Sequence, residues 1–149
     1  VGSSLSISSD GKNVTLTPNS ILADVTTYAV VVSTSVKDRN GLSLVQEFRS
    51  IFTTADETAP TVSSISPSSG SIQVPVNSSI VINTSEPVAA DLNLSQVVQV
   101  SGGQTSVSGT TSLDNTGRII TFVPTGNLAE STTFTVTVNG LRDLGGNVQ

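Results

Sequence analysis

Short segments in which apolar and polar residues alternate constrain the fold of this chain more than any other feature. Phe134, Val136 and Val138 alternate with threonines, and residues 28–32 repeat the pattern. Such a period of two predicts half-buried β-strands, and Val, Ile and Thr suit a pleated surface. Helical spacing is nearly absent, and residues 89–96 give the best candidate, for a single turn. Glycine-rich turn signals separate the segments, so we predict an all-β chain built as an antiparallel β-sandwich.

An internal repeat divides this β pattern into two copies. Residues 11–18 match residues 117–124 at an offset of 106, and the match continues from 22–28 to 128–134. After a slip of one position, it resumes between 36–38 and 141–143. We therefore predict two copies of one supersecondary unit.

The repeat also predicts where the copies meet and what each one lacks. A polar segment closed by Pro60 lies between them, which is typical of a module boundary. We predict that residues 1–55 are the C-terminal part of a first module and that residues 56–149 are a second module lacking its last strand. The simplest interpretation is a stretch of a longer array.

The composition excludes several classes of function. The chain has no His and no Cys, which removes Ser-His-Asp triads, Cys-His pairs and the usual zinc, haem and iron–sulfur sites. Six basic residues stand against eleven acidic ones, a net charge of −5 that offers no footprint for nucleic acid. No apolar run approaches the ~20 residues that cross a bilayer, so we predict no membrane insertion. We expect a protein that is not an enzyme and has no cofactor.

Several motifs of the second copy resemble those of a known family. They are Asp56-Glu57-Thr58-Ala59-Pro60, Val74-Pro75-Val76-Asn77, Ser85-Glu86-Pro87-Val88, Leu128-Ala129 before the Thr-rich strand, and Asp143-Leu144-Gly145-Gly146-Asn147. Together they resemble the bacterial Ig-like domain of the S-layer-protein type. Thr84 stands where the family usually has Phe, and Asp38-Arg39-Asn40-Gly41 departs from the Asp-x-x-Gly-Asn motif in the first copy. The resemblance implies tandem Ig-like modules of bacterial surface proteins such as S-layer subunits, adhesins and spacers beside secreted enzyme domains.

The acidic residues near the module boundary are the metal candidates. Asp143, or Asp38 in the first copy, could offer a carboxylate to Ca²⁺, and Asp56 and Glu57 could join Asp143 or Glu86 in a Ca²⁺ site between modules. No Asp-x-Asp-x-Asp-Gly loop is present. We favour the alternative that the Asp side chains accept hydrogen bonds from backbone N–H groups two residues on and that the boundary is a solvated linker.

Other polar residues give weaker candidates. Glu86 could be a catalytic carboxylate, but no second acid lies at an interpretable spacing. Arg39 and Arg142 could bind anionic glycans, although solvated surface charges are the simpler interpretation. Rows of threonine could form a flat ice- or glycan-binding face, although Thr is ordinary on solvent-facing strands.

Three functions follow from these observations. The leading prediction is a structural repeat of a bacterial cell-surface protein that acts as a spacer and assembly module, with neighbouring modules of the same chain as partners. One alternative is a subunit of an extracellular filament or lattice in which copies exchange strands. Another is a module that binds a glycan or a receptor. Abundant Ser and Thr, few Lys, no Cys or Met and a negative charge favour an extracellular location.

Overall fold

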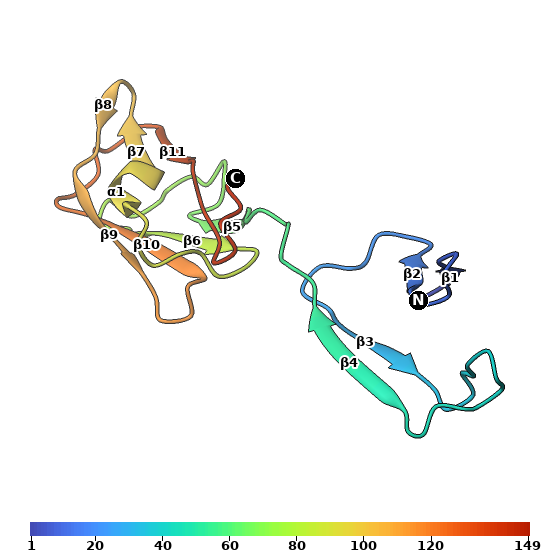
Figure 1. Cartoon of the computed structure of the whole chain (residues 1–149). Coiled ribbons are helices and arrows are strands. Elements are labelled where there is room, and N and C mark those ends of the chain that lie inside the picture. Colours follow the sequence, from blue (N-terminus) through green and yellow to red (C-terminus); the bar gives the residue numbers. More distant parts are fainter. The chain divides into compact units, whose positions relative to one another are not determined.

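Strands form almost all of the regular structure, and every pair of hydrogen-bonded strands is antiparallel. The computed structural model describes all residues from Val1 to Gln149 (Figure 1). It divides into two units, Val1–Asp56 and Glu57–Gln149. The prediction of an all-β chain is confirmed.

Unit 1, Val1–Asp56, consists of two separate two-stranded sheets. The first sheet pairs β1 with β2, and the second pairs β3 with β4. The four strands are β1 (Ser3–Ile7), β2 (Val14–Pro18), β3 (Thr27–Val32) and β4 (Phe48–Thr53). Threonine, valine and isoleucine are common in β2, β3 and β4, as expected for pleated surfaces, whereas β1 is rich in serine.

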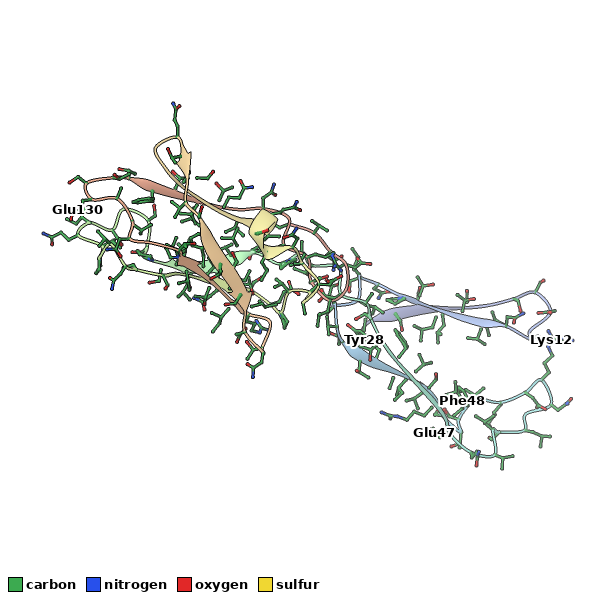
Figure 2. All side chains as sticks on the ribbon, turned by 90° about the vertical axis from the view of Figure 1, so that its left-hand side faces the viewer. Lys12, Tyr28, Glu47, Phe48 and Glu130 are labelled. Carbon is green, nitrogen blue, oxygen red and sulfur yellow. The ribbon has the colours of Figure 1, made fainter.

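No side chain of unit 1 is buried. Tyr28, Val30 and Val32 of β3 are half-buried, whereas every residue of β4 is exposed. Figure 2 labels Tyr28 on β3 and Phe48 at the start of β4, at opposite ends of this sheet. Since Phe48 is 60% exposed and the residues of β3 on the same face are half-buried, this apolar face is only partly covered within the unit.

Unit 2, Glu57–Gln149, contains a four-stranded sheet in the order β5-β6-β10-β9. Its strands are β5 (Val62–Ser66), β6 (Ile80–Thr84), β9 (Gly109–Leu113) and β10 (Ile119–Pro124). Along β6 the side chains alternate strictly between buried and half-buried, because one face of the strand packs on the core.

The second sheet of unit 2 has the order β11-β7-β8. It comprises β7 (Val98–Gly102), β8 (Thr105–Ser106) and β11 (Phe134–Val138). The one-turn helix α1 (Leu94–Val97) leads directly into β7. The helical turn expected within residues 89–96 therefore occupies Leu94–Val97, and it is preceded by a non-helical turn in which the Ala89 carbonyl accepts the backbone N–H of Leu92.

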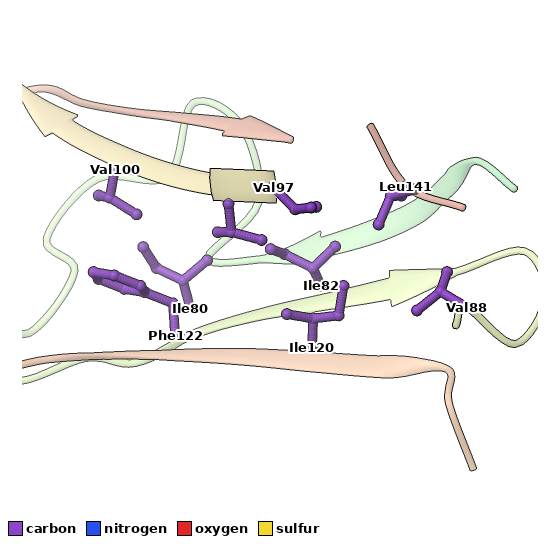
Figure 3. Packing of buried hydrophobic residues seen from close by; sticks show 9 residues of the cluster. Ile80, Ile82, Val88, Val97, Val100, Ile120, Phe122 and Leu141 are labelled. Atoms are coloured by element: carbon purple, nitrogen blue, oxygen red, sulfur yellow. The ribbon is translucent and has the colours of Figure 1, made fainter. Parts of the chain in front are cut away.

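A hydrophobic core fills the space between these two sheets and defines a β-sandwich in unit 2 (Figure 3). Both layers contribute to it: Ile82 of β6 and Ile120 of β10 are fully buried in the first sheet, and Val100 of β7 is buried in the second. The buried cluster consists of Ile80, Ile82, Val88, Val97, Val98, Val100, Ile120, Phe122 and Leu141. Phe134, Val136 and Val138 of β11 pack against this cluster from its margin.

The internal repeat found in the sequence reappears in the strand registers. In unit 1, Ile7 pairs with Val14 and Ser3 with Pro18. In unit 2, the positions 106 residues later pair identically, Leu113 with Ile120 and Gly109 with Pro124. The β1–β2 hairpin therefore has the same register as β9–β10, and β3 occupies the repeat position of β11.

The loops after β3 and β11 also match, at an offset of 105. Leu44 donates its N–H to the Val36 carbonyl at 2.9 Å, and Gln149 donates to the Leu141 carbonyl at 2.9 Å. Gln149 is therefore the equivalent of Leu44 in this loop.

Candidate functional site: the Asp143 loop and the open edge of β11

Asp143 organises the loop that follows β11. Its side chain is buried, with 1% exposed. Oδ1 accepts the backbone N–H of Asn147 at 2.8 Å, and Oδ2 accepts the side-chain amide of Asn147 at 2.7 Å. The backbone N–H of Asp143 donates to the Asn147 carbonyl at 3.1 Å, which closes the loop. Both carboxylate oxygens therefore hold the chain in a tight turn.

Two opposing effects set the pKa of Asp143. Burial alone would raise the pKa, because it disfavours the charged form. The hydrogen bonds from the Asn147 side chain and from the backbone N–H groups of Asn147, Gly146 and Gly145 stabilise the carboxylate. These bonds prevail, and the pKa of Asp143 lies below its ordinary value.

Asp38 occupies the corresponding position in unit 1. Its Oδ1 accepts the backbone N–H groups of Asn40 at 2.8 Å and Leu42 at 2.9 Å. Gly41 has φ of +86°, a conformation that glycine adopts without steric cost. The departure from the family motif in this loop thus leaves the role of the aspartate unchanged.

The other calcium candidates lie at the ends of the two units. Asp56 is the last residue of unit 1 and is half-buried, and Glu57 is the first residue of unit 2 and is exposed. Calcium binding by Asp56, Glu57 and Asp143 stays a prediction. The oxygens of Asp143 already accept hydrogen bonds, so its position is explained without an ion.

Thr84, the residue that replaces the family's Phe, is buried at the end of β6. Its hydroxyl donates to the Glu86 carbonyl at 2.6 Å, and this bond satisfies the buried polar group. The Glu86 side chain is half-buried. The backbone carbonyl of Glu86 accepts this hydrogen bond at the end of β6. Local structure therefore explains the position of Glu86 without a catalytic role for its carboxylate.

The two candidate arginines both make contacts inside their own units. Nη2 of Arg39 donates to the Asp10 carbonyl at 3.1 Å. Nη2 of Arg142 lies 2.6 Å from Oδ1 of Asp91, whose side chain is 75% exposed. An exposed ion pair of this kind contributes about 0–1 kcal/mol.

The open edge of β11 is the most distinctive feature of unit 2. β11 is the outermost strand of its sheet and pairs only with β7. Phe134 lies opposite Gly102, and a Cβ on Gly102 would come within 2.6 Å of the Phe134 ring. Gly102 lies at the end of β7, where its missing side chain makes room for the ring.

The close Gly102–Phe134 approach has no signal in the sequence, because it depends on which strand pairs with β7. Asn147 belongs to a motif that is visible in the sequence, but the hydrogen bonds between Asn147 and Asp143 were not predicted from it.

The two units correspond to two consecutive family matches. The bacterial Ig-like domain family matches residues 1–54 and again residues 56–149. The chain belongs to the bacterial Ig-like domain family. This assignment agrees with the β-sandwich of unit 2 and with the motifs that resemble S-layer-type Ig-like domains.

Comparison with other proteins adds one structural similarity to this bacterial Ig-like chain. The crystal structure of the S-layer protein rSbsC(31-844) is similar, with a TM-score of 0.49 and 19% sequence identity. The similarity covers 61% of this chain and 12% of that protein. No curated protein matches the chain. None of its helices is both long enough and apolar enough to traverse a lipid bilayer.

Proposed function

We propose that this chain is a structural part of a bacterial cell-surface protein, in which Ig-like modules in direct succession act as spacers and assembly elements. The observation that carries the proposal is the pair of family matches, 1–54 and 56–149, with a single residue between them. Modules joined by so short a connection are suited to forming an extended chain of domains. The proposal includes an extracellular location and no enzymatic activity.

The internal organisation of the chain supports this role. The core of unit 2 consists of aliphatic side chains and one Phe between two sheets. The one buried acidic residue, Asp143, accepts hydrogen bonds that hold a loop. Both the apolar core and the hydrogen bonds of Asp143 therefore stabilise the fold of unit 2.

Small-angle X-ray scattering on chains of increasing length tests the spacer role. Because Gln149 is equivalent to Leu44, residues 45–149 can follow Gln149 directly, once, twice or three times. The radius of gyration of a globule grows as about the 0.38 power of length, whereas that of a string of modules grows almost in proportion. We expect near-proportional growth, and the weaker dependence would refute the spacer role.

A further inference from the structure

Four asparagines of the chain begin the motif Asn-x-Ser/Thr, in which x is not proline. This motif is the acceptor of N-linked oligosaccharides in secreted proteins, where it lies in surface loops. The four are Asn13, Asn77, Asn83 and Asn93. Because Ser and Thr are abundant in this chain, such motifs also arise by chance. The surroundings of each asparagine therefore decide which of them can accept a sugar.

Two of the four asparagines are committed to strand structure. Asn83 lies in β6 between β5 and β10, and its Nδ2 donates to the Ser64 hydroxyl at 2.9 Å. Asn13 precedes β2, and both its backbone N–H and its carbonyl are bonded to Ser8. The hydroxyl residue of that motif, Thr15, is paired with β1. A transferase has to bind the asparagine and the hydroxyl residue together, so neither motif is accessible while its sheet is intact.

The segment around Asn93 presents its motif at the surface. Asp91, Asn93 and Ser95 are exposed, whereas the two leucines between them, Leu92 and Leu94, are half-buried and pack against the hydrophobic cluster. The leucines therefore anchor the segment, while the three polar side chains remain accessible to solvent. The helix α1 that follows has only four residues, and a helical turn this short is marginal by itself, so the segment can adapt to an enzyme.

The two side chains that define the motif are already joined. Asn93 is the N-cap residue of α1, yet its side chain makes no capping hydrogen bond. Instead, the Ser95 hydroxyl donates to Oδ1 of Asn93 at 2.7 Å, which holds the amide and the hydroxyl beside each other. Nδ2 of Asn93 donates no hydrogen bond within the chain, in contrast to Nδ2 of Asn83. The nitrogen that would receive a sugar therefore has no competing partner.

An acidic side chain distinguishes this motif from the other three. Asp91 lies two residues before Asn93. The residues at this position of the other motifs are uncharged: Gly11, Pro75 and Val81. The Asp91 side chain is 75% exposed, and its exposed pair with Arg142 is weak enough for an enzyme to displace. A carboxylate at this position offers a transferase a charge-assisted hydrogen bond, which the exposed Asn77 motif lacks.

We propose that Asn93 is the acceptor of an N-linked oligosaccharide and is recognised together with Asp91 and Ser95. In the transfer, Nδ2 of Asn93 attacks C1 of the first sugar of a lipid-pyrophosphate-linked oligosaccharide. The bond between C1 and the pyrophosphate oxygen breaks, the lipid pyrophosphate leaves, and a base of the transferase takes a proton from Nδ2. The proposal rests on the extracellular location included in the proposed function, because this transfer takes place outside the cytoplasm.

Transfer to the purified full chain tests the site directly. The enzyme is a purified bacterial oligosaccharyltransferase that requires an acidic residue two positions before the acceptor, and the donor is its lipid-linked oligosaccharide. We expect a single glycan on each chain, located on Asn93 by tandem mass spectrometry. Asn93→Gln should abolish the transfer, whereas the matched control Asn77→Gln should leave it unchanged.

Two variants of Asp91 separate recognition from folding. Asp91→Asn should lower the transfer rate at least tenfold, whereas Asp91→Glu, which keeps the charge, should retain most of it. Because the ion pair of Asp91 is exposed, neither change should shift the urea unfolding curve of the chain.

Three results would overturn the proposal. They are the absence of a glycan on the unmodified chain, an equal amount of glycan on Asn93→Gln, and equal transfer rates for Asp91→Asn and the unmodified chain. Each result concerns the site alone, because the purified components react wherever the protein resides in the cell. An intracellular location of the protein would instead refute the proposed function and leave transfer to the purified chain intact.

Discussion

Substituting Ile120 by Ala should destabilise unit 2 far more than the repeat-equivalent change Val14→Ala destabilises unit 1. Ile120 is 0% exposed in the sandwich core, whereas Val14 occupies the same position of β2 and is 64% exposed. The two residues have the same strand register, so the substitutions differ mainly in burial. The comparison isolates what the core contributes.

The expected magnitude follows from the atoms removed. Ile120→Ala deletes three buried carbons, which at ~0.8 kcal/mol each amounts to about 2.4 kcal/mol before any cavity is counted. The cavity raises the expected loss toward the upper part of the range of about 2–5 kcal/mol measured for such changes. A domain of this size shifts its melting temperature by about 4–8 °C per kcal/mol. For Val14→Ala we expect less than about 0.5 kcal/mol.

Urea unfolding followed by far-ultraviolet circular dichroism measures both changes. Ile119→Ala is the matched control within β10, because Ile119 precedes Ile120 on the opposite face and is 37% exposed. Equal losses for Ile120→Ala and Val14→Ala would refute the conclusion that only unit 2 contains a packed core. A loss below about 1 kcal/mol for Ile120→Ala would contradict the position of this residue between the sheets.

Three further changes have defined outcomes. Gly109→Ala should cost about 1–3 kcal/mol in urea unfolding, because its Cβ would lie 2.6 Å from the Val123 carbonyl oxygen, which cannot move aside. The pKa of Asp143 is lowered in the folded state, so the stability it provides is present above the ordinary value of 3.8 and is lost as the pH falls through the folded pKa. Asp143→Asn should therefore flatten the acid limb of a plot of unfolding free energy against pH, and an unchanged limb would contradict the assignment. Arg142→Ala should change stability by less than about 1 kcal/mol, because its pair with Asp91 is exposed, and calorimetry showing a larger loss would point to a further role.

The strands with strong alternation were predictable from the sequence. Phe134, Val136 and Val138 show a period of two, and they form β11 with the same face toward the core. β9 was not singled out, because Leu113 is its only large apolar residue and the strand lies at a sheet edge. An edge strand such as β9 buries few side chains, so its sequence shows little hydrophobic alternation.

The sequence was informative about loops but not about close contacts between strands. Asp143 and Asp38 were expected to accept backbone hydrogen bonds in glycine-containing loops, and they do so. The space that Gly102 leaves for Phe134 follows from the pairing of β7 with β11, which no local pattern encodes. Pairing between distant segments depends on the complete fold.

The exposure of Val14 and Leu16 in unit 1 does not follow from the alternation of these residues. Val14 and Leu16 alternate as clearly as Ile120 and Phe122, so the sequence assigns both pairs to core faces. The structure leaves the first pair exposed, because unit 1 has no counterpart of β6 and β7 to cover it.

If the two units are copies of one β module, their hairpins share one strand register in solution, and measuring that register is the most direct test. Nuclear Overhauser contacts between backbone protons report which residues face each other across a strand pair. We expect contacts between Ile7 and Val14 in unit 1 and, at the repeat-equivalent positions, between Leu113 and Ile120 in unit 2. Contacts that place the two hairpins in different registers would contradict the common module.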